Sequence, residues 1–419
     1  MTNWKEYKLG EIAELRREKF TPNESTSYPY IGLEHIEPKS LRLNGIGTSN
    51  DVSSQKSIFY PNDTLYGKLR PYFQKVYSPD FKGVCSTDIF VVKPKKGIDS
   101  IFLFYLLASD EFTSLANSGS TGTRMPRADW KHLSSTIWNI PDLPTQTAIA
   151  EILSSLDDKI ELNNKINQEL ENLAQTLFKQ WFIDFEFPNE NGEPYKSSGG
   201  EMVDSELGEI PENFTISILS EQTELVRGIS YRKPELVSKE EGLPFVNLKC
   251  FALNGTFRQD GLKYFNGKYK EKHIIQPNDI LVAVTDLTQD RVIIGLPILW
   301  NEKEIALPSL DICIVRNENS ALKHFLYYEF KTFRYKSRII EFANGSTVLH
   351  LSVKGLETYE YALPNEDVLI KWNDVISPIL DQINNNIREN QELKNLRDTL
   401  LPKLISGELE VAEVMAEKA

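Results

Sequence analysis

Basic side chains interleaved with aromatic and hydroxyl side chains are the groups of this sequence with the clearest chemistry. In the first half they occur at 66–72 and 120–127, and in the second half at 227–233, 263–272 and 346–350. Lysine and arginine neutralise phosphates, arginine forks bind guanine, and serine and threonine reach base edges or the backbone. We therefore predict these DNA-contacting residues: Tyr66, Lys68, Arg70, Tyr72, Ser120, Thr121, Arg124, Arg127, Arg227, Tyr231, Arg232, Lys268, Lys270, Ser346, Thr347 and His350.

Each cluster alone is also compatible with a solvated loop. Recurrence next to Gly-Ser-Thr loops in both halves favours binding. Lys68, Arg70, Lys268 and Lys270 are expected to contact phosphates, whereas Arg124, Arg127, Arg232 and the Ser/Thr loops are candidates for reading bases. The run 330–338 is interpreted instead as the solvated face of an amphipathic helix.

Patterns typical of catalysis are absent from the sequence. It contains no GxSxG, HExxH or CxxC pattern, and the segment 261–269 fails the phosphate-binding loop pattern because it has one residue too many and lacks the final Ser or Thr. The five histidines and three cysteines are dispersed. Asp157 and Asp158 are adjacent, so on a helix they point in different directions and are expected to be solvated. We predict no catalytic residue and no metal site.

The acidic charge of the chain is confined to particular segments. The formal net charge is −13, but residues 1–140 and 213–364 are close to neutral and hold most of the lysines and arginines. The excess of Asp and Glu lies in 141–212 and 365–419. A negative total therefore does not exclude two local basic faces. The acidic segments are unlikely partners for phosphate, and we expect them to face each other and partner proteins.

Two long helices are expected to position the basic clusters. Apolar residues recur at spacings of three and four from Ile149 to Trp181, and again from Ile376 to Leu404. Pro144 followed by Thr145-Gln146-Thr147 indicates the start of the first helix, and Thr145 is expected to cap it. Asn-Gln-Glu-Leu begins a stretch at 167–177 that returns at 390–400 with eight of eleven residues identical. This long-period repeat indicates a duplicated module.

Shorter matches extend the duplication into the segments before each helix. Tyr60-Pro-Asn-Asp-Thr-Leu is matched by Gln276-Pro-Asn-Asp-Ile-Leu, and Ser86-Thr-Asp-Ile by Ser309-Leu-Asp-Ile. Both segments are expected to be mixed α/β, with a helix over 101–115 in the first. We predict an α+β fold with two mixed α/β domains separated by two long antiparallel helices that form a coiled coil with pseudo-two-fold symmetry. The expected boundaries are 1–143, a helix region at 144–187, a polar linker at 188–212, a second domain at 213–364, and a second helix region with a tail at 365–419.

Composition indicates the surroundings in which the chain works. An odd, sparse set of cysteines argues against a disulfide framework and fits a reducing compartment. The N-terminus has no apolar signal core, and no apolar run reaches the length of a membrane span. We expect a soluble cytoplasmic protein with no membrane partner.

These motifs resemble the specificity (S) subunit of type I restriction–modification systems. Similar to the family are the segment Ile140-Pro-Asp-Leu-Pro-Thr-Gln with the helix that follows, the repeated Asn-Gln-Glu-Leu, and the tail Leu401-Pro-Lys-Leu-Ile-Ser-Gly-Glu-Leu. The second copy departs from the first where Leu143-Pro-Thr-Gln becomes Asn365-Glu-Asp-Val. The resemblance covers essentially the whole chain.

The resemblance implies two target-recognition domains, each reading one half of a bipartite, asymmetric site in double-stranded DNA. The helices would set the gap between the halves, so that adding four residues after Leu156 should lengthen it. It also implies methyltransferase (M) and restriction/translocase (R) subunits as partners. S-adenosylmethionine, ATP and Mg²⁺ are expected on those partners and no cofactor on this chain, which lacks an Asn-Pro-Pro-Tyr/Phe box.

Two other classes of function remain open from the sequence. A protein-interaction scaffold would have the same two modules but no specific DNA binding, and the local basic balance argues against it. A stand-alone methyltransferase or nuclease is disfavoured by the missing motifs.

Overall fold

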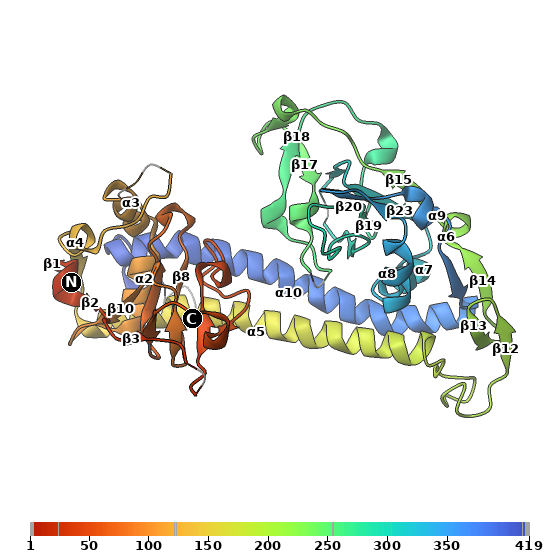
Figure 1. Ribbon diagram of the computed structural model, residues 1–419, viewed down its shortest axis with the longest axis horizontal. Coiled ribbons are helices and arrows are strands. Elements are labelled where there is room, and N and C mark those ends of the chain that lie inside the picture. Colours follow the sequence, from red (N-terminus) through yellow and green to blue (C-terminus); the bar gives the residue numbers. More distant parts are fainter. Residues whose placement is uncertain are drawn as a thin grey trace. The chain divides into compact units, whose positions relative to one another are not determined.

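The computed structural model describes residues 4–23, 25–120, 122, 124–253, 255–302, 304–412 and 414. It contains two compact units (Figure 1). Unit 1 comprises Met1–Asn164 and Ile387–Ala419, and unit 2 comprises Lys165–Asn386. Two long helices, α5 (Leu143–Phe182) and α10 (Glu366–Ser406), each contribute one half to each unit.

The N-terminal module of unit 1 is built on two sheets and a closing strand pair. Its strand orders are β2-β10-β7-β8 and β3-β6-β9-β4-β5. The pair β1–β11 brings the first strand of the module next to its last, with Lys5 opposite Ile140. The strands are β1 (Lys5–Lys8), β2 (Ala13–Leu15), β3 (Lys19–Phe20), β4 (Pro29–Ile31), β5 (Gly47–Thr48), β6 (Lys56–Phe59), β7 (Thr64–Gly67), β8 (Val76–Tyr77), β9 (Gly83–Cys85), β10 (Ile89–Pro94) and β11 (Ile137–Ile140).

The expected helix over 101–115 is two helices, α2 (Ser100–Ala108) and α3 (Asp110–Ser118). Ser109 separates them because its backbone is extended, and its hydroxyl accepts a hydrogen bond from the amide of Phe112 at 3.1 Å. Serine favours this capping position because its oxygen satisfies an otherwise unpaired amide of the first turn. The spacing of apolar residues continues across Ser109, so the sequence pattern could not reveal the break between the two helices.

The C-terminal module of unit 2 repeats this topology. The order β15-β23-β19-β21 corresponds to β2-β10-β7-β8, and the pair β14–β26 corresponds to β1–β11. A second sheet has the order β16-β18-β17-β22, and a third the order β20-β25-β24. The strands are β14 (Thr215–Ile218), β15 (Glu224–Arg227), β16 (Leu236–Val237), β17 (Leu243–Val246), β18 (Lys263–Phe265), β19 (Ile280–Ala283), β20 (Thr285–Asp286), β21 (Pro297–Leu299), β22 (Leu307–Pro308), β23 (Ile312–Arg316), β24 (Ala343–Asn344), β25 (Leu349–Leu351) and β26 (Glu360–Leu363).

Short helices complete both modules. In unit 2, the buried helix α7 (Ser320–Glu329) is followed by α8 (Phe333–Ile340). The remaining short α-helices are α1 (Leu9–Ile12), α4 (Trp130–Leu133), α6 (Leu219–Gln222) and α9 (Val353–Glu357). The prediction of two mixed α/β modules with two long helices is therefore confirmed.

The two long helices are antiparallel, and their pairing is seen separately in each unit. In unit 1, Asn163 of α5 lies against Asn390 of α10, and Arg397 of α10 binds Asp157 of α5 at 2.6 Å. Asp157 also accepts a 2.6 Å hydrogen bond from the hydroxyl of Tyr105 on α2. The prediction that Asp157 is a solvated carboxylate was wrong: it joins the module to both helices, while Asp158 is exposed.

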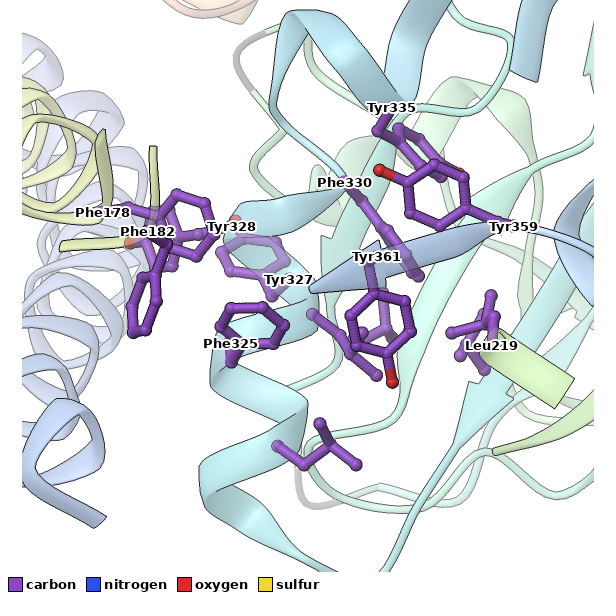
Figure 2. Close-up of a cluster of buried hydrophobic side chains, with 14 of the residues drawn as sticks. Phe178, Phe182, Leu219, Phe325, Tyr327, Tyr328, Phe330, Tyr335, Tyr359 and Tyr361 are labelled. Atoms are coloured by element: carbon purple, nitrogen blue, oxygen red, sulfur yellow. The ribbon is translucent and has the colours of Figure 1, made fainter. Parts of the chain in front are cut away.

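In unit 2 an aromatic cluster fixes the module to the helices (Figure 2). Phe178 and Phe182 of α5 contact Phe325 of α7, with ring centroids 5.6 and 4.9 Å apart. Trp372 of α10 packs on Phe182 at 5.2 Å. Burial of such large rings is the main apolar contribution to docking. Beside them, Glu171 of α5 accepts a 2.6 Å hydrogen bond from Lys331.

Three further expectations differ from the structure. Helix α5 is capped by Asp142, whose carboxylate accepts from the amide of Thr145, and not by Thr145 itself. The run 330–338 is not a uniformly solvated face, because Lys331 and Tyr335 are buried. The segment 188–212 contains the hairpin β12 (Met202–Ser205)–β13 (Gly208–Pro211), and Phe187 stacks on Tyr195 at 4.6 Å.

Candidate nucleic-acid interface

The connection between β7 and β8 carries the first basic cluster. It contains a short 3₁₀ helix, Pro71–Phe73, bounded by Arg70 and Gln74, whose φ angles are +51° and +48°. Residues other than glycine rarely adopt this left-handed backbone conformation. It stores strain of the kind found at functional sites. The side-chain amide of Gln74 holds the turn by donating to the carbonyl of Ala108 at 2.5 Å.

The second basic cluster of unit 1 lies beside the first. The amide of Arg70 donates to the carbonyl of Pro126 at 2.7 Å, and the amide of Ala128 donates to the carbonyl of Lys68 at 2.9 Å. The Arg127 guanidinium binds the carboxylate of Asp88 at 3.1 Å. The structure therefore brings the segment 68–70 next to 126–128, so that Lys68, Arg70 and Arg127 lie on adjacent segments that are more than 50 residues apart in the sequence. Tyr72 and Arg124 belong to the same two clusters.

Three other predicted residues of unit 1 have different positions. Tyr66 is 1% exposed within β7 and its ring packs edge-on against Phe112 at 5.0 Å, so it is a core residue and leaves the candidate set. Ser120 follows α3 and its amide donates to the carbonyl of Asn117. Thr121 lies outside the described residues.

One basic group of unit 2 surrounds the sheet β16-β18-β17-β22. Tyr231 packs edge-on against Phe245 at 5.2 Å, and the ammonium of Lys263 lies 5.5 Å from the centroid of the Tyr231 ring. Arg232 is exposed beside it, and its amide donates to Glu235. The other predicted cations of this group, Arg227 at the end of β15 and Lys268 and Lys270 after β18, are exposed as well.

A second group of unit 2 surrounds the sheet β20-β25-β24. Ser346 and Thr347 are exposed in the turn between β24 and β25, and His350 lies 3.3 Å from the hydroxyl of Thr285. The side chain of Gln289 donates to the carbonyl of Ser346 at 3.1 Å. This contact joins the Gly-Ser-Thr turn to the connection 286–293.

Sequence reasoning missed the connection 286–293. It lies between β19 and β21, as 68–75 lies between β7 and β8, but it follows the short strand β20, and it contains Arg291 at φ +57°. Asp286 stabilises the turn by accepting from the amides of Thr288 at 2.8 Å and Ile293 at 2.9 Å. Burial alone would raise the pKa of Asp286, but these hydrogen bonds together lower it, so the carboxylate stays ionised. The strand order was the signal that could have found this loop.

Several other chemistries find no support in the part of the chain that the structure describes. Its His, Cys, Asp and Glu side chains form no group of three that could hold a metal ion. Burial raises the pKa of Cys85, Cys250 and Cys313 to about 12, 11 and 12, so their thiols are poor nucleophiles. None of the helices in the described ranges has both the length and the apolar character needed to cross a membrane.

Comparisons with known proteins show which proteins this chain is similar to. Residues 1–172 match the family described as the type I restriction modification DNA specificity domain. The type I restriction enzyme HindI specificity subunit of Haemophilus influenzae is 27% identical, over 98% of this chain and 100% of that protein. The type I restriction enzyme MjaIX specificity subunit of Methanocaldococcus jannaschii is 28% identical, over 99% of this chain and 90% of that protein.

A solved structure supports the fold. The type I restriction–modification S subunit from M. genitalium superposes with a TM-score of 0.54, at 15% identity and over 96% of each chain. At this identity the likeness concerns the fold alone. Residues 1–172 thus match the type I restriction modification DNA specificity domain, and the chain as a whole is similar to type I restriction enzyme specificity subunits.

Proposed function

We propose that this chain is the DNA sequence-recognition subunit of a type I restriction–modification complex. Each α/β module reads one half of a bipartite site, and α5 with α10 sets the gap between the halves. One observation carries the proposal. The connection 68–75 of one module and the corresponding connection 286–293 of the other each lie beside a second polar loop. The similarity to type I restriction enzyme specificity subunits disfavours the scaffold alternative.

Phosphate and base contacts are divided among the exposed cations. Lys68 and Arg70 in one module, and Lys268 and Lys270 in the other, bind phosphates and set the position of each module on the duplex. Arg124, Arg127 and Arg232 with the Ser/Thr turns read base edges. Asp88 orients Arg127 through its 3.1 Å contact, which restricts the guanidinium to a smaller set of directions.

The chemistry of modification and cleavage belongs to partner subunits in this proposal. Methyltransferase subunits supply S-adenosylmethionine, and restriction subunits supply ATP and Mg²⁺. The acidic surfaces of α5 and α10 are the docking faces for the methyltransferase subunits, because they carry the excess negative charge and repel phosphate. This chain contributes no catalytic residue.

Arg124→Ala tests the proposal in the complex with the methyltransferase subunits. Loss of one arginine fork removes about 1–3 kcal/mol of base discrimination, so methylation should extend to sites altered at one position of one half-site. The other half-site should be unchanged. Lys8→Ala, at an exposed position of β1, is the matched control. Unchanged specificity at both half-sites in the Arg124 variant contradicts the assignment.

Binding to random duplex DNA separates this function from a protein scaffold. If several lysines and arginines contact phosphates, the logarithm of the affinity should fall steeply and linearly with the logarithm of the salt concentration. A scaffold would bind random duplexes weakly and with little dependence on salt.

A further inference from the structure

We propose that the connection 70–74 of unit 1 and the connection 287–292 of unit 2 are apolar wedges, each of which unstacks a base step inside its half-site. The inference rests on the proposed function and adds a way of reading DNA: specificity from the sequence-dependent cost of distorting the duplex. It assigns a role to four residues that direct hydrogen-bond reading leaves without one, namely Tyr72, Phe73, Leu287 and Val292.

The unit 1 connection exposes two neighbouring aromatic rings on a fixed turn. Tyr72 is 46% exposed and Phe73 is 39% exposed, with ring centroids 4.7 Å apart. Arg70 and Gln74 bound the turn with left-handed backbone, and Gln74 is held by the carbonyl of Ala108. The fold thus keeps a strained turn that directs two aromatic rings into water, although burying them would be favourable.

The surroundings of these rings identify the occupant. Arg70 precedes them in the turn, its amide donates to the carbonyl of Pro126 next to Arg127, and the ammonium of Lys68 lies 5.5 Å from the centroid of the Phe90 ring. A partner must therefore be anionic at its edges and offer flat apolar surface between those charges. A base step of a nucleic-acid duplex satisfies both requirements, since stacked bases lie between two rows of phosphates.

The unit 2 connection has the same design with aliphatic side chains. Leu287 is 67% exposed and Val292 is 47% exposed, and Arg291 stands between them with left-handed backbone. The ammonium of Lys336 on α8 donates to the carbonyl of Val292 at 3.0 Å, and Gln289 donates to the carbonyl of Ser346. Leucine and valine have the shape of residues that wedge between bases and kink a duplex.

The two connections occupy corresponding positions in their modules, which argues against a chance exposure of these apolar side chains. One lies between β7 and β8 and the other, after β20, between the corresponding strands β19 and β21, and each is tied to a neighbouring polar loop. The aromatic pair and the aliphatic pair share no sequence motif. In both modules, exposed apolar side chains lie in the same connection as an arginine whose backbone is in the left-handed conformation.

Base unstacking is measured on the complete complex with its methyltransferase subunits. The probe is a duplex that carries the methylation-mapped target, with 2-aminopurine placed at successive positions of either half-site. The fluorescence of this base increases when it leaves the stack. The wild-type complex should increase the signal at one step in each half-site. Tyr72→Ala with Phe73→Ala should abolish the increase in one half-site only, and lower the affinity about tenfold, as expected for one lost stacking contact.

Matched variants separate a wedge from a general loss of stability. Leu287→Ala with Val292→Ala should abolish the signal in the other half-site, and Tyr72→Phe should retain it. Ile137→Ala on β11 and Ile216→Ala on β14 remove exposed apolar side chains from the terminal strand pairs and should change nothing. If the first double variant does not fold, the Leu287 and Val292 variant gives an independent reading.

The outcomes distinguish the wedge from the proposed function. A wild-type complex that methylates a bipartite site without any increase in fluorescence overturns the wedge and leaves the function in place. The same holds if both double variants keep the full signal. A complex that binds all duplexes equally contradicts the proposed function instead.

Discussion

Asn163 of α5 donates a hydrogen bond of 2.9 Å to the side-chain oxygen of Asn390 of α10, near the midpoint of α5. In unit 2, Asn386 of α10 donates to Asn167 of α5 at 2.7 Å. The 223-residue repeat converts one pair into the other, with the two helices exchanged. A buried asparagine at a helix seam fixes the register of the pair at some expense of stability, so these amides define how α5 lies against α10.

Asn163→Ala should destabilise unit 1 by about 1–3 kcal/mol, because Asn390 and Glu389 both lose a donor. The measurement is denaturant unfolding of the full chain. Asn172→Ala is the control, since Asn172 is exposed on the same helix and accepts only a surface hydrogen bond from Gln168. Equal effects of the two substitutions would show that the seam contact adds nothing.

Lys331→Met should destabilise unit 2 more than any exposed lysine variant does. Lys331 and Glu171 are both buried, so removing one partner leaves a buried charge without compensation, at a cost of about 3–5 kcal/mol. Adding Glu171→Leu should recover most of this loss, because the double variant buries no charge. Unfolding of the single and double variants measures the coupling, and additive losses would contradict it.

Lys336 gives a pH dependence with a defined sign. Burial lowers the pKa of its ammonium from 10.5 to about 8, against a smaller opposing effect of Asp286. Between about pH 8 and 10.5 the unfolded chain therefore binds more protons than the folded one, and stability rises with pH across that window. The gain should be on the order of 1 kcal/mol, because the partly exposed group is screened by water.

The test compares wild type with Lys336→Met and with Lys354→Met, an exposed lysine of α9. Thermal unfolding from pH 7 to 10.5 should give a smaller rise in stability for the Lys336 variant than for the wild type. The Lys354 variant should follow the wild type. Parallel curves for all three proteins would mean that Lys336 has an ordinary pKa in the folded state.

The sequence was sufficient to predict the two long helices and the duplication of the module. Apolar residues at spacings of three and four act locally, so the stripe from Ile149 to Trp181 predicted α5 within a few residues. The site was predictable only in part. Charge and composition singled out Arg70 and Arg127 as candidates, whereas the burial of Tyr66 depends on packing against Phe112, which comes from a distant segment.

Long-range pairing explains the other differences. Lys331 was read as solvated because its neighbours are basic, and only the carboxylate of Glu171, 160 residues away, accounts for its burial. The connection 286–293 holds one arginine and no Gly-Ser-Thr run, so its composition gave no signal. Its role becomes visible through the order of the strands, which is a property of the folded module.

The gap between half-sites measures directly whether α5 and α10 set the distance between the two modules on DNA. Seven residues copied from each helix are inserted between Asn164 and Lys165 in α5, and between Asn386 and Ile387 in α10. At about 1.5 Å per residue the insertion adds about 10 Å, or roughly three base pairs at 3.4 Å each. The control carries seven residues between Glu190 and Asn191, outside both helices.

Methylated sites are then mapped across the genome of cells that express each complex. We expect a bipartite motif for the wild type and the control, and the same two half-sites separated by a longer gap for the helix variant. An unchanged gap in an active helix variant, or a continuous motif in the wild type, would contradict it.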